Sequence, residues 1–125
     1  MMIFLRALRF ALHGILDSLR TERNFRIQVA FAVGAVILGG LLDINPSEWL
    51  WIGLSVFLVL AAELFNTALE AVTDLVSPAK HELAKKAKDA AAAGVLMVAI
   101  FSIICGFIIF LPKLALVIKQ LTRVT

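Results

Sequence analysis

The chain has 125 residues, of which 62% are hydrophobic and only 17% are charged. So short a chain is a single domain (1–125), and a soluble domain of this size could not bury that much apolar surface. The composition also excludes a disordered chain, and the lone cysteine, Cys105, excludes an internal disulfide or a zinc site. The net charge of +3 therefore suggests loops that face anionic lipid, with no nucleic acid partner. A membrane protein is the first prediction.

The segment of about residues 3–22 has the pattern of an amphipathic helix. Arginines and other polar side chains recur at helical spacing, and apolar residues such as Phe4, Leu8 and Leu12 occupy much of the remainder. A helix of this kind lies in the membrane interface with its apolar face in lipid. We therefore expect an N-terminal surface helix.

Three apolar stretches follow that are candidates to cross a bilayer, which needs about 20 apolar residues. They cover about residues 27–42, 49–72 and 90–111. The first is broken only by Gln28 and is rich in Gly and Ala, which favours close helix packing. The third carries no charge, and Pro112 is predicted to end it. The predicted fold class is an all-α membrane protein with a surface helix and three transmembrane helices.

The distribution of Lys and Arg predicts the topology. The N-terminal segment holds five arginines and the loop between the second and third spans holds four lysines, whereas residues 43–48 hold neither. The positive-inside rule therefore places the N-terminus and the second loop in the cytoplasm and the C-terminus outside, against which Lys113, Lys119 and Arg123 argue weakly. Trp49 and Trp51 fit an aromatic anchor at the outer face.

The second apolar stretch carries carboxylates at positions that should lie within the membrane. Glu63 follows Trp49 by fourteen residues, or ~21 Å along a helix, which leaves it inside the hydrocarbon core. Glu70 and Asp74 share its helical face, and Asn66 lies beside that stripe. A charge within the core costs about 2.5–3.5 kcal/mol on insertion scales, so the stripe needs a partner.

The residues alone leave two interpretations of this stripe open. It is either a seam between helices, with Asn66 as hydrogen-bonding glue and the acids protonated or paired with Lys, or a functional site. Carboxylates seven residues apart are typical ligands of hard cations, which fits Mg²⁺-assisted chemistry or an ion path. No P-loop, dinucleotide-binding, protein-kinase, zinc-protease or serine-hydrolase motif is present in the sequence.

Two further clusters flank the spans. After the second span comes a basic run in which Lys88 could meet a phosphate and Asp89 could hold Lys88 or a second metal; the run is Lys80-His81-Glu82, Lys85, Lys86, Lys88 and Asp89. Before the first span, Glu22 is a lone acid among arginines, and pairing with Arg23 or Arg26 is its simplest explanation.

Taken together, these residues resemble a known family. The pattern Glu63-x-x-Asn66-Thr67-Ala68-x-Glu70-x-x-x-Asp74, followed by His81-Glu82-Leu83 and Ala87-Lys88-Asp89, is similar to that of the prokaryotic diacylglycerol kinases and the related undecaprenol kinases. The stretch Glu22-Arg23-Asn24-Phe25-Arg26 looks like the N-terminal motif of the same family. The resemblance extends from about Phe10 to about Pro112.

The resemblance implies an ATP- and Mg²⁺-dependent lipid kinase of the bacterial inner membrane. It implies a homotrimeric bundle with active sites shared between subunits and transfer of the γ-phosphoryl group to a lipid hydroxyl at the cytoplasmic interface. Glu63 matches the general base, Asn66 the active-site amide, and Glu22 and Glu70 the Mg²⁺ ligands, with Asp74 as a supporting acid. The implied ATP-binding residues are Phe10, Glu22, Glu70, Ala79, Lys80, His81, Lys88 and Asp89. Lipid contacts are expected at Asn24, Phe25, Trp49 and Glu63.

The sequence also departs from the family pattern and leaves choices open. At the position near the start of the surface helix where the family pattern has an arginine, this chain has Ile3. Arg6 or Arg9 would therefore have to make the N-terminal phosphate contact. The lipid is either diacylglycerol or undecaprenol. A small channel or proton-coupled transporter subunit is the alternative function, although Ser55 is the only polar residue in the outer half of the second span. The role of residues 113–125 is open.

Overall fold

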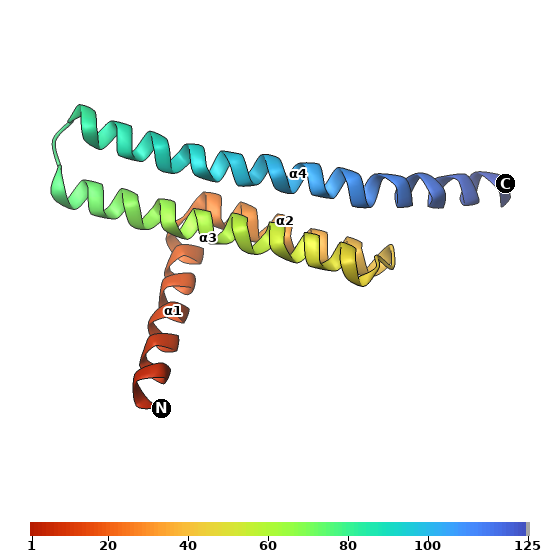
Figure 1. Cartoon of the computed structure of the whole chain (residues 1–125), viewed down its shortest axis with the longest axis horizontal. Coiled ribbons are helices and arrows are strands. Elements are labelled where there is room, and N and C mark those ends of the chain that lie inside the picture. The colour runs from red at the N-terminus through yellow and green to blue at the C-terminus, as the bar shows by residue number, and fades with distance from the viewer. Residues whose placement is uncertain (125) are drawn as a thin grey trace.

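The computed structural model describes residues 1–124, and its regular structure is entirely α-helical. In chain order the helices are α1 (Met2–Thr21), α2 (Arg23–Leu41), α3 (Pro46–Val76) and α4 (Glu82–Val124). Helices α2, α3 and α4 run side by side as a bundle, and α1 leaves this bundle at a steep angle (Figure 1). The prediction of an all-α chain with a separate N-terminal helix is therefore confirmed.

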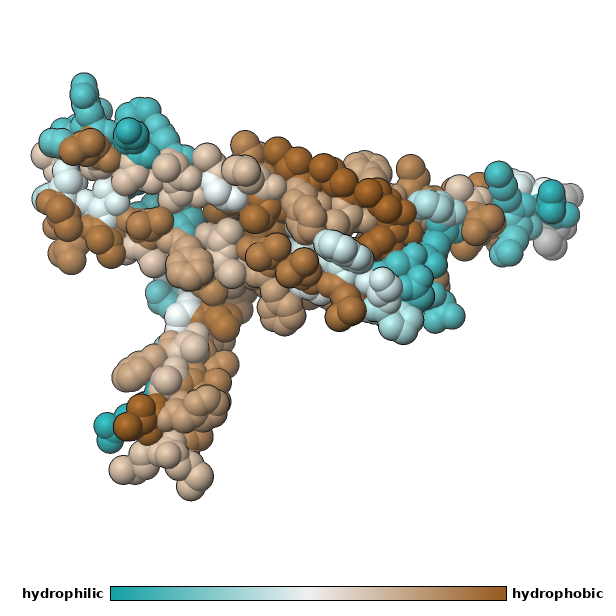
Figure 2. Space-filling model, in the orientation of Figure 1, coloured by the Kyte–Doolittle hydropathy of each residue, from teal (hydrophilic) through white to brown (hydrophobic). Residues whose placement is uncertain are grey.

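Helices α2, α3 and α4 are each long and apolar enough to cross a membrane. Hydrophobic side chains cover the middle of the bundle, while hydrophilic ones gather at the α3–α4 loop and at the opposite end of the bundle, where α2 turns into α3 (Figure 2). We call these the loop end and the turn end. This distribution is that of a membrane protein, as the composition predicted.

The corner between α1 and α2 is built around Glu22. This residue has an extended backbone (φ −98°, ψ 113°) between the two helices. Arg26 folds back over the corner, and its Nη1 donates to the carbonyl oxygens of Leu19 (3.3 Å) and Arg20 (3.0 Å). These bonds satisfy carbonyls that the end of α1 leaves free. Arg26 is thus used as a cap, and no ion pair joins it or Arg23 to Glu22 within residues 1–124, contrary to the simplest expectation.

The turn between α2 and α3 is fixed by a capping box. The Oδ1 of Asn45 accepts from the backbone N–H of Glu48 (2.9 Å), and the Oε2 of Glu48 accepts from the backbone N–H of Asn45 (2.8 Å). Pro46 occupies the first helical position, where its missing N–H costs nothing. The Nζ of Lys113 on α4 lies 3.2 Å from the Oε2 of the same Glu48 and ties α4 to this end.

Helix α3 packs mainly against α4, and the buried core lies toward the turn end. The buried residues of this core are Ile44, Ile52, Ile109 and Phe110. Closer to the loop end than this core, the Ser102 Oγ donates to the Ser55 carbonyl oxygen across the α3–α4 interface (3.4 Å). Cys105 is buried as expected of a packing residue.

Helix α4 does not end before Pro112, as had been expected, but continues through it to Val124. Proline removes one backbone hydrogen bond and crowds the preceding turn. Such positions are tolerated in membrane helices, because neighbouring groups can satisfy the freed carbonyl. Beyond the proline, α4 extends past the ends of α2 and α3 (Figure 1).

Candidate active site

Glu63 is the only charged side chain that is buried among the described residues, with 4% of its surface exposed. It lies in the middle of α3, a helix whose other buried residues are Ile52, Ser55 and Val59. Its Oε1 accepts a hydrogen bond from the Gln28 Nε2 of α2 at 3.5 Å. A carboxylate held this deep between two apolar helices is costly and needs a reason other than packing.

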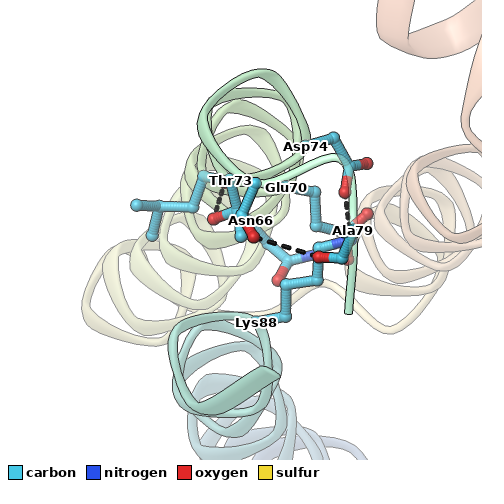
Figure 3. A network of polar contacts seen from close by, with 8 residues as sticks. Asn66, Glu70, Thr73, Asp74, Ala79 and Lys88 are labelled. Carbon is cyan, nitrogen blue, oxygen red and sulfur yellow. Dashed lines mark hydrogen bonds and ion pairs between the residues drawn. The ribbon is translucent and has the colours of Figure 1, made fainter. Parts of the chain in front are cut away.

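Asn66 and Glu70 form a second polar pair one helical turn closer to the loop end. The Asn66 Nδ2 donates to the Glu70 Oε1 at 3.1 Å (Figure 3). The Asn66 Oδ1 is buried and accepts no hydrogen bond. Because an unpaired buried acceptor is unfavourable, a hydrogen-bond donor or a cation bound at this oxygen would be stabilising.

Glu22 brings a third acid toward this region from the α1–α2 corner. Glu22 and Glu70 both lie near enough to Glu63 for their charges to act on it. The Glu22 Oε1 accepts from the Thr21 Oγ1 at 3.4 Å, and Glu22 is half-buried. The chain therefore gathers three carboxylates from two separate segments, with no basic side chain paired to any of them in the part of the chain that the structure describes.

The donor set fits a magnesium–phosphate complex better than a bare metal centre. No group of three or more His, Cys, Asp or Glu side chains in residues 1–124 converges to enclose an ion. Magnesium, however, usually takes one or two protein carboxylates and completes its octahedron with water and phosphate oxygens. Glu22, Glu70 and the free Asn66 Oδ1 supply oxygens of that kind.

A second cluster surrounds the loop end, where a cavity of about 580 Å³ opens between the ends of α3 and α4. It is lined by Asp74, Ser77, Pro78, Ala79, Lys80, His81, Glu82, Ala84, Lys85, Lys88 and Asp89. The Ser77 Oγ donates to the Ala79 carbonyl oxygen (3.0 Å), and the His81 Nδ1 accepts from the Leu83 N–H (3.1 Å) and so closes the first turn of α4. The cavity is open, and three lysines, Lys80, Lys85 and Lys88, line it.

The sequence suggested that Asp89 could hold Lys88, but these two residues do not pair with each other. Lys88 forms an ion pair with Asp74 across the ends of α3 and α4 (Figure 3), and Asp89 pairs with Lys85 at 2.6 Å. Adjacent residues on a helix point in different directions, whereas residues four apart lie on one face. Lys88 is thus held over the loop cavity by Asp74.

Four further residues of the expected site lie outside the lining of the loop cavity. Phe10 is exposed on α1, and α1 contacts α2 and α3 but not α4 within residues 1–124, so that Phe10 is separate from Lys88 and Asp89. Phe25 is buried, with 2% of its surface exposed. Asn24 is exposed beside the corner, and Trp49 packs over Gly39 at the turn end, far along α3 from Glu63.

Neither Gln28 nor the apolar cavity that it lines was predicted to be part of the site. This cavity of about 330 Å³ lies between α2, α3 and α4 and has Gln28, Val59, Ser55 and Ser102 among its lining residues. Val59 precedes Glu63 by one turn, so the cavity follows the face of α3 that carries the buried carboxylate. A lone polar residue in an otherwise apolar span was the signal that could have identified Gln28.

Comparison with known proteins agrees with the resemblance. The family model described as prokaryotic diacylglycerol kinase matches residues 9–110. An undecaprenol kinase of Bacillus subtilis is 43% identical over 89% of this chain and 90% of its own length. A diacylglycerol kinase of Synechocystis is 42% identical over 85% of this chain and 61% of its own length. A diacylglycerol kinase of Escherichia coli is 31% identical over 80% of this chain and 82% of its own length.

Proposed function

The chain belongs to the prokaryotic diacylglycerol kinase family and is a lipid kinase, and we propose that it transfers the γ-phosphoryl group of ATP to the hydroxyl of a membrane lipid. The observation that carries this proposal is the buried Glu63 carboxylate, placed within a membrane helix and close to two further acids. A lipid alcohol reaches such a site by lateral diffusion, with its hydroxyl near the headgroup level and its chain in the hydrocarbon.

In this proposal Glu63 is the general base. Its free oxygen takes the proton of the lipid hydroxyl while the hydroxyl oxygen forms a bond to the γ-phosphorus and the bond from that phosphorus to the β–γ bridging oxygen breaks. ADP and the phosphorylated lipid are the products. Proton transfer to a positioned carboxylate contributes typically 10²–10⁴-fold to a rate. Positioning and charge neutralisation supply most of the remainder in phosphoryl transfer.

Glu22 and Glu70 would hold Mg²⁺, with Asn66 orienting Glu70 through its Nδ2. When bound, the cation neutralises charge on the triphosphate. The lysine-rich loop cavity suits the nucleotide: Lys88, held by Asp74, faces the phosphates, and Ala79, Lys80 and His81 line the wall. The open shape of this cavity and its cationic walls support the assignment.

We further propose a homotrimer in which neighbouring subunits complete each site. In one chain α1 does not reach α4, so that Phe10 and the arginine that replaces the N-terminal phosphate contact, Arg6 or Arg9, would serve the loop cavity of an adjacent subunit. Many large apolar side chains remain exposed on the bundle, enough for both lipid and subunit contacts.

The same proposal places α1 flat on the inner face of the bacterial cytoplasmic membrane. The N-terminus and the loop end would then face the cytoplasm, where ATP is available, because both segments are rich in Arg or Lys. The steep angle between α1 and the bundle suits a helix in the membrane plane (Figure 1). The exposed apolar residues Phe4, Leu8 and Leu12 would face the lipid.

The acceptor is diacylglycerol or undecaprenol, and the apolar cavity beside Glu63 offers room for part of the hydrocarbon chain of either. Gln28, which lines this cavity, also bonds the Glu63 carboxylate, and this link supports a lipid substrate. A channel or transporter is not favoured, because the turn-end half of the bundle is packed with apolar side chains and because the chain belongs to a kinase family.

The test is transfer of labelled phosphate from ATP to lipid by the purified protein in mixed micelles with Mg²⁺. Diacylglycerol and undecaprenol are assayed separately. We expect transfer to at least one lipid and a loss of 10²-fold or more in Glu63→Gln, as expected for removal of a general base. Asp43→Asn is the matched control, since Asp43 lies in the turn at the opposite end of the bundle and Asn tolerates its positive φ of 49°. Absence of transfer to both lipids by a folded protein would refute the proposal.

A further inference from the structure

Gln28 is the polar side chain that touches the buried carboxylate. It is half-buried on α2, and its Nε2–Glu63 Oε1 contact at 3.5 Å joins residues 35 positions apart in the sequence. It is the one side-chain hydrogen bond that Glu63 makes among the described residues. The bond is long for N–H···O, but catalytic hydrogen bonds commonly shorten once the reactants are in place.

The charges around Glu63 explain why a neutral donor is useful there. Glu22 from the α1–α2 corner and Glu70 from the same helix both act on Glu63 with negative charge. Repulsion from these two acids would favour other orientations of the Glu63 side chain. A lysine at position 28 would hold the carboxylate but also neutralise it, whereas an amide holds one oxygen and leaves the negative charge intact.

The position of Gln28 also determines which oxygen is free. The amide binds Oε1 from the side of α2. Gln28 also lines the apolar cavity, which runs along α3 on the turn-end side of Glu63. With Oε1 engaged, Oε2 is the oxygen left to accept a proton. The remaining cavity walls are apolar apart from Ser55 and Ser102, whose hydroxyls donate to backbone carbonyls. Among the described residues that line this cavity, Gln28 is therefore the one whose polar group bonds Glu63.

We propose that Gln28 is a positioning residue that orients the Glu63 carboxylate for proton transfer from the lipid hydroxyl. This inference rests on the proposed function of Glu63 as the base. Gln28 need not touch either substrate, so its removal should slow the chemical step rather than weaken binding. Such a pattern differs from that of a lipid-binding residue, whose loss raises KM.

The primary variant is Gln28→Met, which keeps the length and unbranched shape of the side chain and removes the N–H donor. We expect kcat to fall about 10–100-fold, the scale of a misplaced catalytic group, with KM for ATP and for the lipid within about twofold. Gln28→His retains a ring N–H donor and should recover part of kcat. Ala30→Leu, at an exposed position of the same helix, is the control for added apolar volume.

A double-mutant cycle with Glu63→Gln identifies the residue through which Gln28 acts. If Gln28 works through the carboxylate, Gln28→Met should change the residual rate of the Glu63→Gln protein by less than about twofold. An equal loss in both backgrounds would show an independent role and overturn the inference, as would an unchanged kcat in Gln28→Met. An unchanged kcat in Glu63→Gln alone would instead remove the proposed base itself, so the two failures are distinguishable.

Should Gln28→Met not fold, Gln28→His and Gln28→Leu provide the same comparison of a donor with an apolar side chain. Circular dichroism and the elution volume of the detergent-solubilised protein establish whether each variant is folded. Higher kcat in the folded His variant than in the folded Leu variant supports the inference, and equal values contradict it.

Discussion

Gly39 provides a sharp test of the packing at the turn end. A Cβ atom at this position would lie 2.8 Å from the Trp49 Cη2 and 3.0 Å from the Ile44 Cδ1, both closer than van der Waals contact allows. Gly39→Ala must therefore displace the indole ring, and overpacking of this kind costs about 1–3 kcal/mol. The next residue, Gly40, has nothing within 4 Å of such a Cβ.

The comparison of Gly39→Ala with Gly40→Ala isolates the steric cost. Both substitutions gain the same helix propensity, about 1 kcal/mol, so this gain cancels in the difference. We expect Gly39→Ala to be less stable than Gly40→Ala by about 1–3 kcal/mol. Reversible unfolding in mixed micelles measures the difference, and Trp49→Phe should restore much of the stability in the Gly39→Ala background.

Two results would refute this reasoning. Equal stabilities of the two alanine variants would mean that the indole moves aside at no cost. A large loss of kcat in folded Gly39→Ala would mean that the turn end and the acidic region are coupled, although Trp49 and Glu63 are separated by ~21 Å along α3.

The remaining predictions concern the proposed cation and nucleotide regions. Glu70→Gln should raise the Mg²⁺ concentration needed for half-maximal activity several-fold while changing the lipid KM less than twofold, since Mg²⁺ prefers carboxylate ligands; the opposite pattern in titrations of metal and lipid would contradict this role. Asp74→Asn should lower stability by less than about 1 kcal/mol, because its ion pair with Lys88 is partly exposed. The same variant should raise KM for ATP about two- to fivefold by releasing Lys88, and an unchanged KM would show that Lys88 needs no support.

Those features that follow from periodicity within one helix could be predicted from the sequence. The three apolar helices and the alignment of Glu63 with Glu70 depend on composition and on the 3.6-residue repeat alone. The Asn66–Glu70 bond follows from the same rule, since residues four apart lie on one face. The roles of these side chains in catalysis remain proposals.

Features that depend on contacts between helices could not be read in the same way. Gln28 is 35 positions from Glu63, and no local pattern indicates that α2 delivers its amide to that carboxylate. The partners of Lys88 depend equally on how α3 and α4 meet, which brings Asp74 closer than its neighbour Asp89. Pro112 misled because local propensity ends a helix there, whereas α4 continues through it.

The spacing along α3 gives the proposed reaction an order in space. Asp74 and Lys88 hold the loop end, Glu70 lies one turn or ~6 Å deeper, and Glu63 lies ~10 Å beyond Glu70. A nucleotide seated in the loop cavity would therefore point its phosphates from the lysine toward Glu70, and the lipid hydroxyl would meet the terminal phosphoryl group from the hydrocarbon side at Glu63. Because each group lies at a different depth, loss of Lys88, Glu70 or Glu63 should affect nucleotide, metal and proton transfer separately, and one common defect in all three variants would argue against this arrangement.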